Sequence, residues 1–238
     1  MTNTRETRFD TSEAVAAAFG IPLIAYGLPV GAALAIGELA TRLAPPVVAT
    51  LVTVVLLVVA HAVGAAAVAR LVATASASVP ASWAFAGGRL PRALLGTVYP
   101  AAFVMVATLL VTAVGVLLPG MPAFIALALA LLVAIIVVPT LRTLPLLVLT
   151  ERRGAAAIRD SWGPTEVSRT APVLVMIATV AALVLASLAL APMAVPIVTG
   201  VVLSLVAIVG ATVLVTVASV QALQRVQELD DTESLVAA

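Results

Sequence analysis

The sequence predicts an all-α membrane protein, a polytopic bundle of six transmembrane helices with short cytoplasmic amphipathic helices. Of its 238 residues, 63% are hydrophobic and 10% are charged, and the mean hydropathy is +1.25. In addition, residues 93–141 and 170–224 contain no Asp, Glu, Lys, Arg or His. A hydrocarbon layer of about 30 Å needs about 20 apolar residues per helix. Each of these uncharged tracts is therefore long enough to cross a membrane twice.

The first two spans are expected at residues 14–37 and 47–69. The first is an uncharged stretch that ends at Glu38, and it is too long for the apolar region of a cleaved signal peptide. Pro22 and Pro29 should kink it. The second follows the helix-start signal at Pro45.

Spans three and four are expected at residues 94–118 and 122–149. They follow a less apolar connection, residues 70–92, which we interpret as a surface helix and a turn. The sequence LLPGMPA supplies the turn between the two spans, with Pro and Gly at its centre. The fourth span is expected to continue past Pro139.

Spans five and six are expected at residues 171–190 and 197–220, separated by the Pro-containing segment APMAVP. The six helices form one transmembrane domain, residues 1–223. The tail, residues 224–238, is acidic and is expected to be disordered.

The arginines predict the orientation of the chain. With six spans, eleven of the twelve Arg residues fall on one side and only Arg42 falls on the other. The positive-inside rule then places both termini in the cytoplasm of a multi-pass protein of the cell membrane. Trp83 and Trp162 lie in the long loops of the same side, where indole rings favour the headgroup level.

Two residues are candidates for an intramembrane polar niche: His61 and Arg142. An arginine within a span is costly, so Arg142 is either an anchor near the cytoplasmic end or a buried cation that meets an anionic group. His61 precedes Arg70 by nine residues, about 13 Å along a helix, which is the expected depth of Arg142. It is either a neutral packing residue or a functional one.

The connection between spans four and five is a candidate cytoplasmic docking or interface loop. Ala155, Ile158 and Trp162 share one helical face, which we expect to lie on the membrane surface. Gly163 and Pro164 should end this helix. The candidate docking residues are Glu151, Arg152, Arg153, Arg159, Ser161 and Trp162.

Small residues predict close contacts between helices. Gly27 and Gly31 are one turn apart in the first span, and Ala60 and Gly64 are one turn apart in the second. We interpret both pairs as packing within the chain, with a dimer seam as the alternative.

Several classes of function are disfavoured. The chain has no cysteine, which excludes thiolate nucleophiles and disulfides. We find no cofactor fingerprint and no metal-binding pattern, and no expected span has an Asp or Glu in its interior, so neither a cofactor nor catalysis is expected. A net charge of +1 argues against a nucleic-acid partner. The expected partners are the lipid bilayer and, at the loops, a possible protein; the sequence does not indicate an oligomeric state.

One segment resembles a known family. The sequence LPLLVLTE, then RRGAAAIRDSW, is similar to the integral-membrane domain of membrane-bound glycerophosphodiester phosphodiesterases and of related stand-alone six-span proteins. Gly163 and Pro164 depart from that pattern, and the phosphodiesterase domain has no counterpart here. The resemblance implies a membrane bundle, and it does not imply phosphodiesterase activity. The pattern would be filled by Glu151, Ala157, Ile158, Arg159, Ser161 and Trp162.

The leading hypothesis is a non-enzymatic membrane protein whose cytoplasmic loops dock a partner or lipid headgroups. Polar residues concentrate in those loops, whereas the expected spans are almost wholly apolar. The alternative is a small transporter or channel subunit with a polar niche at His61 and Arg142. An enzyme acting on lipid ranks third.

Overall fold

The structure is a computed structural model that describes residues 11–74, 77–102, 141–150, 154–162, 170–190 and 196–236. Within these ranges the regular secondary structure is entirely helical. Residues 90–102 form a helix that directly follows α4. The labelled helices are α1 (Thr11–Ala18), α2 (Ile21–Leu43), α3 (Pro46–Ala73), α4 (Val79–Gly88), α7 (Thr143–Leu149), α8 (Gly154–Ser161), α9 (Thr170–Leu190) and α10 (Pro196–Val236).

Four of these helices are long and apolar enough to cross a membrane. They are α2, α3, residues 171–190 of α9 and residues 198–229 of α10. This confirms the all-helical class, and four of the expected spans correspond to helices that could cross a membrane. The expected third and fourth spans lie mainly in residues 103–140, outside the described ranges, so the total of six stays a prediction.

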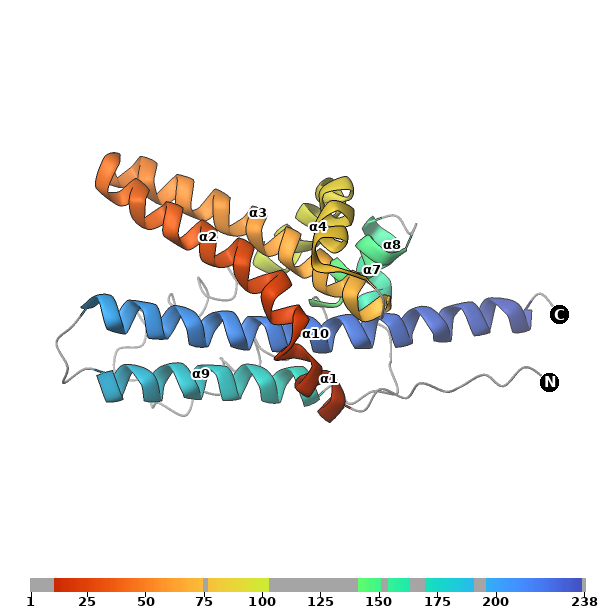
Figure 1. Cartoon of the computed structure of the whole chain (residues 1–238). Helices are drawn as coiled ribbons and strands as arrows, with labels where there is room; N and C mark the ends of the chain where they lie inside the picture. The colour runs from red at the N-terminus through yellow and green to blue at the C-terminus, as the bar shows by residue number, and fades with distance from the viewer. Residues whose placement is uncertain are drawn as a thin grey trace, which may run out of the picture.

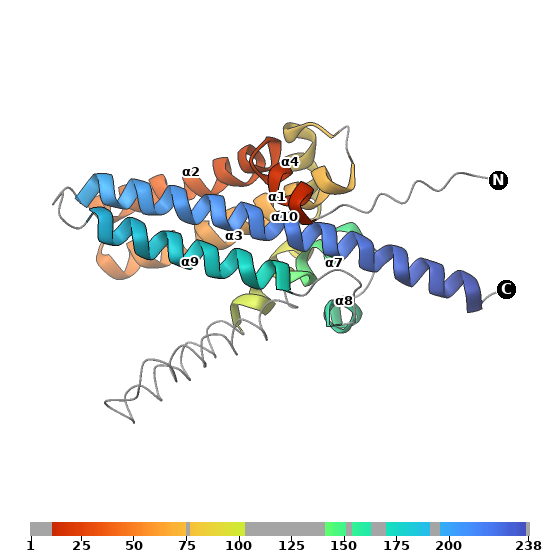
Figure 2. The same cartoon turned by 90° about the horizontal axis from the view of Figure 1, so that it is seen from below.

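The long helices form two antiparallel hairpins, α2 with α3 and α9 with α10, as Figure 1 shows. Figure 1 also shows α10 between α9 and the first hairpin, and Figure 2, a view from below, shows α9 and α10 side by side in front of α2 and α3. α10 contacts α9, α3 and α2, and it also touches α1 and α7. At 41 residues it is about 60 Å long, twice the thickness of a hydrocarbon layer, so it extends well beyond the bundle.

The two ends of the bundle differ in charge. The α2–α3 turn lies at the same end as the end of α9, and Arg42 is in the last turn of α2. At the opposite end α2 begins, α3 finishes, and α4, α7 and α8 gather (Figure 1). We call this the arginine-rich end, after the described arginines that these elements carry: Arg70, Arg89, Arg92, Arg142 and Arg159.

The outer surface of the hairpins is apolar. On α9, Leu174 is 62% exposed, Leu185 is 66% exposed and Leu188 is 67% exposed. Contiguous exposure of large aliphatic side chains is unfavourable in water and is suited to a lipid environment. Helix α9 therefore presents to the surroundings the side chains that a membrane would solvate.

The first span differs from its expected form. Helix α1 ends at Ala18, and α2 begins at Ile21 and continues to Leu43, beyond the expected end at residue 37. Pro22 lies in the first turn of α2, where its missing N–H has no intrahelical partner to lose. It therefore begins the helix and does not kink it, whereas Pro29 lies inside.

The expected fourth span, residues 122–149, is not one continuous helix at its end. The helix is interrupted at Arg142, and the short helix α7 follows. Residues 143–148 are all buried, because α7 packs against both α3 and α10. From residue 143 onward the expected fourth span is therefore buried within the protein, and its position in the membrane stays a prediction.

The expected disordered tail, residues 224–238, is helical as far as Val236. Arg225 and Glu228 are three residues apart on α10, and Nη1 of Arg225 lies 2.9 Å from Oε2 of Glu228. Such a pair favours the helix. The Gln and Glu residues around it are also good helix formers, and this local preference outweighs the acidic composition.

Only some of the expected glycine contacts occur. A Cβ atom built on Gly64 would lie 2.9 Å from Cδ2 of Tyr26, so α3 approaches α2 closely there. A Cβ on Gly27 would lie 3.3 Å from Ile208, whereas one on Gly31 would meet nothing within 4 Å. Gly64 thus allows the two helices of the first hairpin to approach beside Tyr26, as Gly37 does beside Thr53, where an added Cβ would lie 2.7 Å from the Thr53 side chain.

Candidate functional site

A hydrogen bond joins the two helices of the first hairpin. The hydroxyl of Tyr26 on α2 lies 2.7 Å from Nδ1 of His61 on α3, and the two rings meet edge to face with centroids 5.6 Å apart. Tyr26 is 4% exposed. Both residues lie nearly the same number of positions from Ala44 in the α2–α3 turn, 18 before it and 17 after it, so an antiparallel hairpin brings them together. The sequence contained this signal, and our reading of it missed Tyr26.

The surroundings of Tyr26 determine which nitrogen of His61 carries the proton. Within the described chain, Nδ1 of His61 is the one partner of the Tyr26 hydroxyl. If Nδ1 carried the proton, the buried Tyr26 hydroxyl hydrogen would have no acceptor, at a cost of about 1–3 kcal/mol. The hydroxyl therefore donates to Nδ1, and the proton of the neutral ring is on Nε2.

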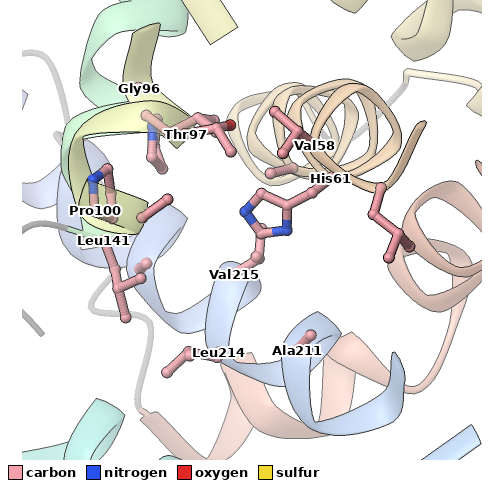
Figure 3. A pocket seen from close by; sticks show the side chains of 15 residues that line it. Val58, His61, Gly96, Thr97, Pro100, Leu141, Ala211, Leu214 and Val215 are labelled. Atoms are coloured by element: carbon pink, nitrogen blue, oxygen red, sulfur yellow. The ribbon is translucent and has the colours of Figure 1, made fainter. Parts of the chain in front are cut away.

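A cavity of about 320 Å³ lies beside His61. Figure 3 shows the imidazole ring directed into a space bordered by Thr97 and Pro100, by Leu141, and by Leu214 and Val215. Among the fifteen lining residues, only His61 and Thr97 have a polar side chain, and the Thr97 hydroxyl donates to the carbonyl of Ala93. The cavity is thus apolar apart from the edge of one imidazole.

The cavity is formed where four elements meet: α3, the helix of residues 90–102, α7 and α10. A Cβ atom on Gly96 would lie 2.6 Å from Cα of Leu144, so the helix of residues 90–102 and α7 are in backbone contact. That contact closes one wall. Helix α10 lines the cavity with Leu214 and Val215 and with the small side chains of Ala211 and Ala218.

Arg142, the second candidate for the niche, is 2% exposed at the start of α7. It is therefore buried, as the functional interpretation requires. Its neighbours Leu141 and Leu144 line the cavity beside His61, but Arg142 is not among the lining residues. The two candidates lie on adjacent elements, and a shared niche stays a prediction.

Two arginines surround an aromatic ring at the arginine-rich end. The guanidinium carbon of Arg70 lies 4.6 Å from the ring centroid of Phe85, and that of Arg89 lies 4.9 Å from it. Each contact is a cation–π interaction. That of Arg70 joins the last turn of α3 to α4, and that of Arg89 is local, because Arg89 caps α4 itself. No sequence motif indicated this role of Phe85.

Arginines also complete the end of α7. The last carbonyl groups of a helix have no intrahelical partner. Nη1 of Arg89 donates to the carbonyl of Val148, and Nη1 of Arg92 donates to that of Thr150, at 3.4 Å. Cations are favourable at a helix C-terminus, so these arginines have a structural role.

Helix α8 packs against the protein through one face and leaves the opposite face outward. Its buried residues are Ala157, Asp160 and Ser161, and Ala157 packs against Leu146, Leu147 and Ala222. The expected membrane face is outward: Ala155 and Trp162 are exposed and Ile158 is partly exposed, because the small residue Ala157 fits against α7. Contact of this face with the membrane stays a prediction. The side chain of Arg159 is 82% exposed, and Trp162 is 42% exposed.

The candidate docking residues therefore separate into three groups. Arg159 and Trp162 are exposed, and Ser161 is buried with its hydroxyl donating to the carbonyl of Ile158. The remaining candidates lie outside the described residues: Glu151, Arg152 and Arg153.

The expected position of the Trp83 ring at the headgroup level stays a prediction, and its indole N–H bonds within the protein. This group donates to the carbonyl of Ala25 on α2, at 2.9 Å. The bond fixes α4 against the start of the first hairpin. In the described ranges, no three His, Asp or Glu side chains lie close enough together to hold a metal ion.

The fold defines a class: an all-helical protein with at least four helices that are long and apolar enough to cross a membrane. Comparison with known proteins finds no matching family model, no matching curated protein and no matching solved structure.

Proposed function

We propose that this chain is a non-enzymatic, multi-pass protein of the cell membrane whose cytoplasmic loop at α8 contacts anionic lipid headgroups. The observation that supports this most directly is the exposed side chain of Arg159, with the partly exposed Trp162 three residues later. A guanidinium and an indole at this spacing are suited to the phosphate and carbonyl levels of a membrane.

The other arginines of the same end strengthen the assignment by contrast. Arg89 and Arg92 bond to backbone carbonyls at the end of α7, and Arg70 stacks on Phe85. Their charges stabilise the fold. Arg159 lies 4.0 Å from Asp160, but at its high exposure this pair is weak, so the guanidinium is available to an outside anion.

The orientation belongs to the same proposal. Arg42 lies at the α2–α3 turn, whereas the described arginines of α3, α4, α7 and α8 lie at the other end. The positive-inside rule then puts the arginine-rich end and both termini in the cytoplasm. The likeness of residues 142–162 to the membrane domains of glycerophosphodiester phosphodiesterases is compatible with such a bundle, and it supplies no catalytic group.

The transporter or channel alternative has less support. A pathway for a polar solute needs several polar groups facing inward. The cavity beside His61 offers one imidazole edge, and Arg142 is not among its lining residues. We therefore favour headgroup contact.

Tryptophan quenching tests the proposal. In the variant Trp83→Phe, Trp162 is the sole tryptophan. The protein is reconstituted with lipids that are brominated near the headgroup. These lipids are either phosphatidylglycerol, which is anionic, or phosphatidylcholine. We expect stronger quenching by the anionic lipid, because it is enriched beside Arg159.

Arg159→Gln should remove much of this preference, and Arg42→Gln, at the other end, is the matched control that should preserve it. Equal quenching by the two lipids before and after Arg159→Gln would contradict the proposal. So would the absence of quenching by either lipid, which is the result expected if α8 instead contacts a protein partner.

A further inference from the structure

We infer that the cavity beside His61 is a binding site for a neutral, mostly apolar molecule of about two fused rings that carries one carbonyl oxygen. The carbonyl would accept a hydrogen bond from Nε2–H of His61. This inference is independent of headgroup contact at α8, because it concerns a different surface and a different chemistry.

The volume sets the size of the ligand. An apolar cavity of roughly 150 Å³ in a protein core accommodates benzene. The cavity here, at about 320 Å³, is about twice as large, and it falls at the lower end of the range of small-molecule sites. A compact bicyclic molecule matches this volume.

The hydrogen-bonding group sets the functional group of the ligand. The Tyr26 hydroxyl donates a hydrogen bond to Nδ1 of His61, so the proton of the neutral ring is on Nε2. Within the described chain Nε2 has no partner, and the ring points into the cavity (Figure 3). An N–H donor in an apolar cavity is complemented by an acceptor, and a carbonyl oxygen is the strongest neutral one.

The lining indicates that the ligand is neutral. Ala, Leu, Val, Pro and Gly surround the imidazole, and the Thr97 hydroxyl has already donated its hydrogen. No described lining residue has a formal charge. A carboxylate or ammonium group would therefore be desolvated without a counter-charge, which costs several kcal/mol or more.

The depth of His61 favours a molecule dissolved in the membrane over the ester group of a lipid. His61 precedes Arg70, at the end of α3, by nine residues, or about 13 Å along the helix. Lipid esters lie near the headgroups, whereas a dissolved aryl ketone reaches this depth. Both sources share the carbonyl, so the experiment must separate them.

The test uses two probes of nearly equal size and shape. The first is 2-acetylnaphthalene, a ketone, and the second is 2-isopropenylnaphthalene, in which C=CH₂ replaces the C=O group of the first. The full chain is placed in lipid nanodiscs, and bound probe is measured by equilibrium dialysis as the excess over empty nanodiscs. We expect the ketone to bind about 3- to 10-fold more tightly, the contribution of one neutral hydrogen bond.

His61→Leu should weaken the binding of the ketone only, so that the two probes bind with similar affinity. Because this change leaves the Tyr26 hydroxyl without a partner, the double variant Tyr26→Phe/His61→Leu provides a second form with no unpaired polar group. Ala211→Phe, which fills the cavity from α10, should weaken both probes. The unfolding temperature, followed by tryptophan fluorescence, establishes that each variant is folded.

Nanodiscs of ester-linked and of ether-linked lipids identify the natural source. Equal ketone affinity in both supports a dissolved lipophile, and weaker binding in ester lipids assigns the site to a lipid carbonyl. The inference is overturned if the two probes bind equally to the unmodified chain or if neither binds in excess. It is also overturned if the ketone preference survives in both His61 variants.

Discussion

Tyr26 and His61 share a hydrogen bond of 2.7 Å between α2 and α3, beside a glycine that lets the two helices approach. The same contact orients the imidazole toward the cavity (Figure 3). One pair of residues therefore links the packing of the hairpin to the chemistry of the candidate site.

The bond between Tyr26 and His61 should be measurable as a coupling. Tyr26→Phe and His61→Leu, alone and together, form a double-mutant cycle for the free energy of unfolding in detergent. We expect a coupling of about 0.5–1.5 kcal/mol, because each single change leaves the other group unpaired in a buried site. Additive effects would show that the bond contributes nothing to stability.

Gly64→Ala should destabilise the first hairpin. The added Cβ would lie 2.9 Å from the Tyr26 ring and 3.1 Å from its Cα, so α2 has to move. Overpacking of this kind costs about 1–3 kcal/mol. Thermal unfolding in detergent measures the loss.

Gly31→Ala is the matched control for this change, because nothing lies within 4 Å of its added Cβ. We expect it to be neutral or to stabilise by up to about 1 kcal/mol, since Ala favours helix over Gly. Similar losses at both glycines would mean that helix spacing is not set at Gly64.

Arg89→Met should loosen the arginine-rich end. The change removes the donor to the Val148 carbonyl and the cation over Phe85, while it keeps much of the side-chain volume. A hydrogen bond from a charged group is worth about 1.5–3 kcal/mol, and we expect a loss of that size. Hydrogen exchange should rise in α7.

Arg42→Met provides the comparison for the arginine-rich end. Arg42 forms a pair with Glu38 in which both side chains are about two-thirds exposed, with 3.1 Å between Nη2 and Oε1. Exposed pairs contribute little, so α7 exchange should not change. If it changes as much as in Arg89→Met, the bond to Val148 is not the cause.

Single cysteines should report the two sides of the membrane, because the chain has none of its own. Thr41→Cys lies in the last turn of α2 and Ala155→Cys lies on α8; both positions are exposed. In sealed vesicles, an impermeant maleimide should label only one of them from outside. Labelling of both from the same side would contradict the proposed topology.

The sequence by itself determined that the chain is suited to a membrane and that its secondary structure is helical. Long stretches without charge leave only helices that satisfy their own backbone, and α2, α3, α9 and α10 occur where those stretches predicted apolar helices. It also distributed the charges, since Arg42 is separated from the other described arginines whatever the details of packing.

Other features depended on contacts between segments distant in the chain. The stretch from Thr143 to Leu149 is as apolar as a span, yet it is a short buried helix because α3 and α10 leave room for it. Likewise, Asp160 and Ser161 are buried whereas Trp162 is exposed, because Ala157 is small enough to pack against α7. Hydropathy measures transfer out of water, and it has the same value whether an apolar side chain meets lipid or protein. Only the tertiary structure decided which of the two each helix face meets, and where a lone imidazole borders a cavity.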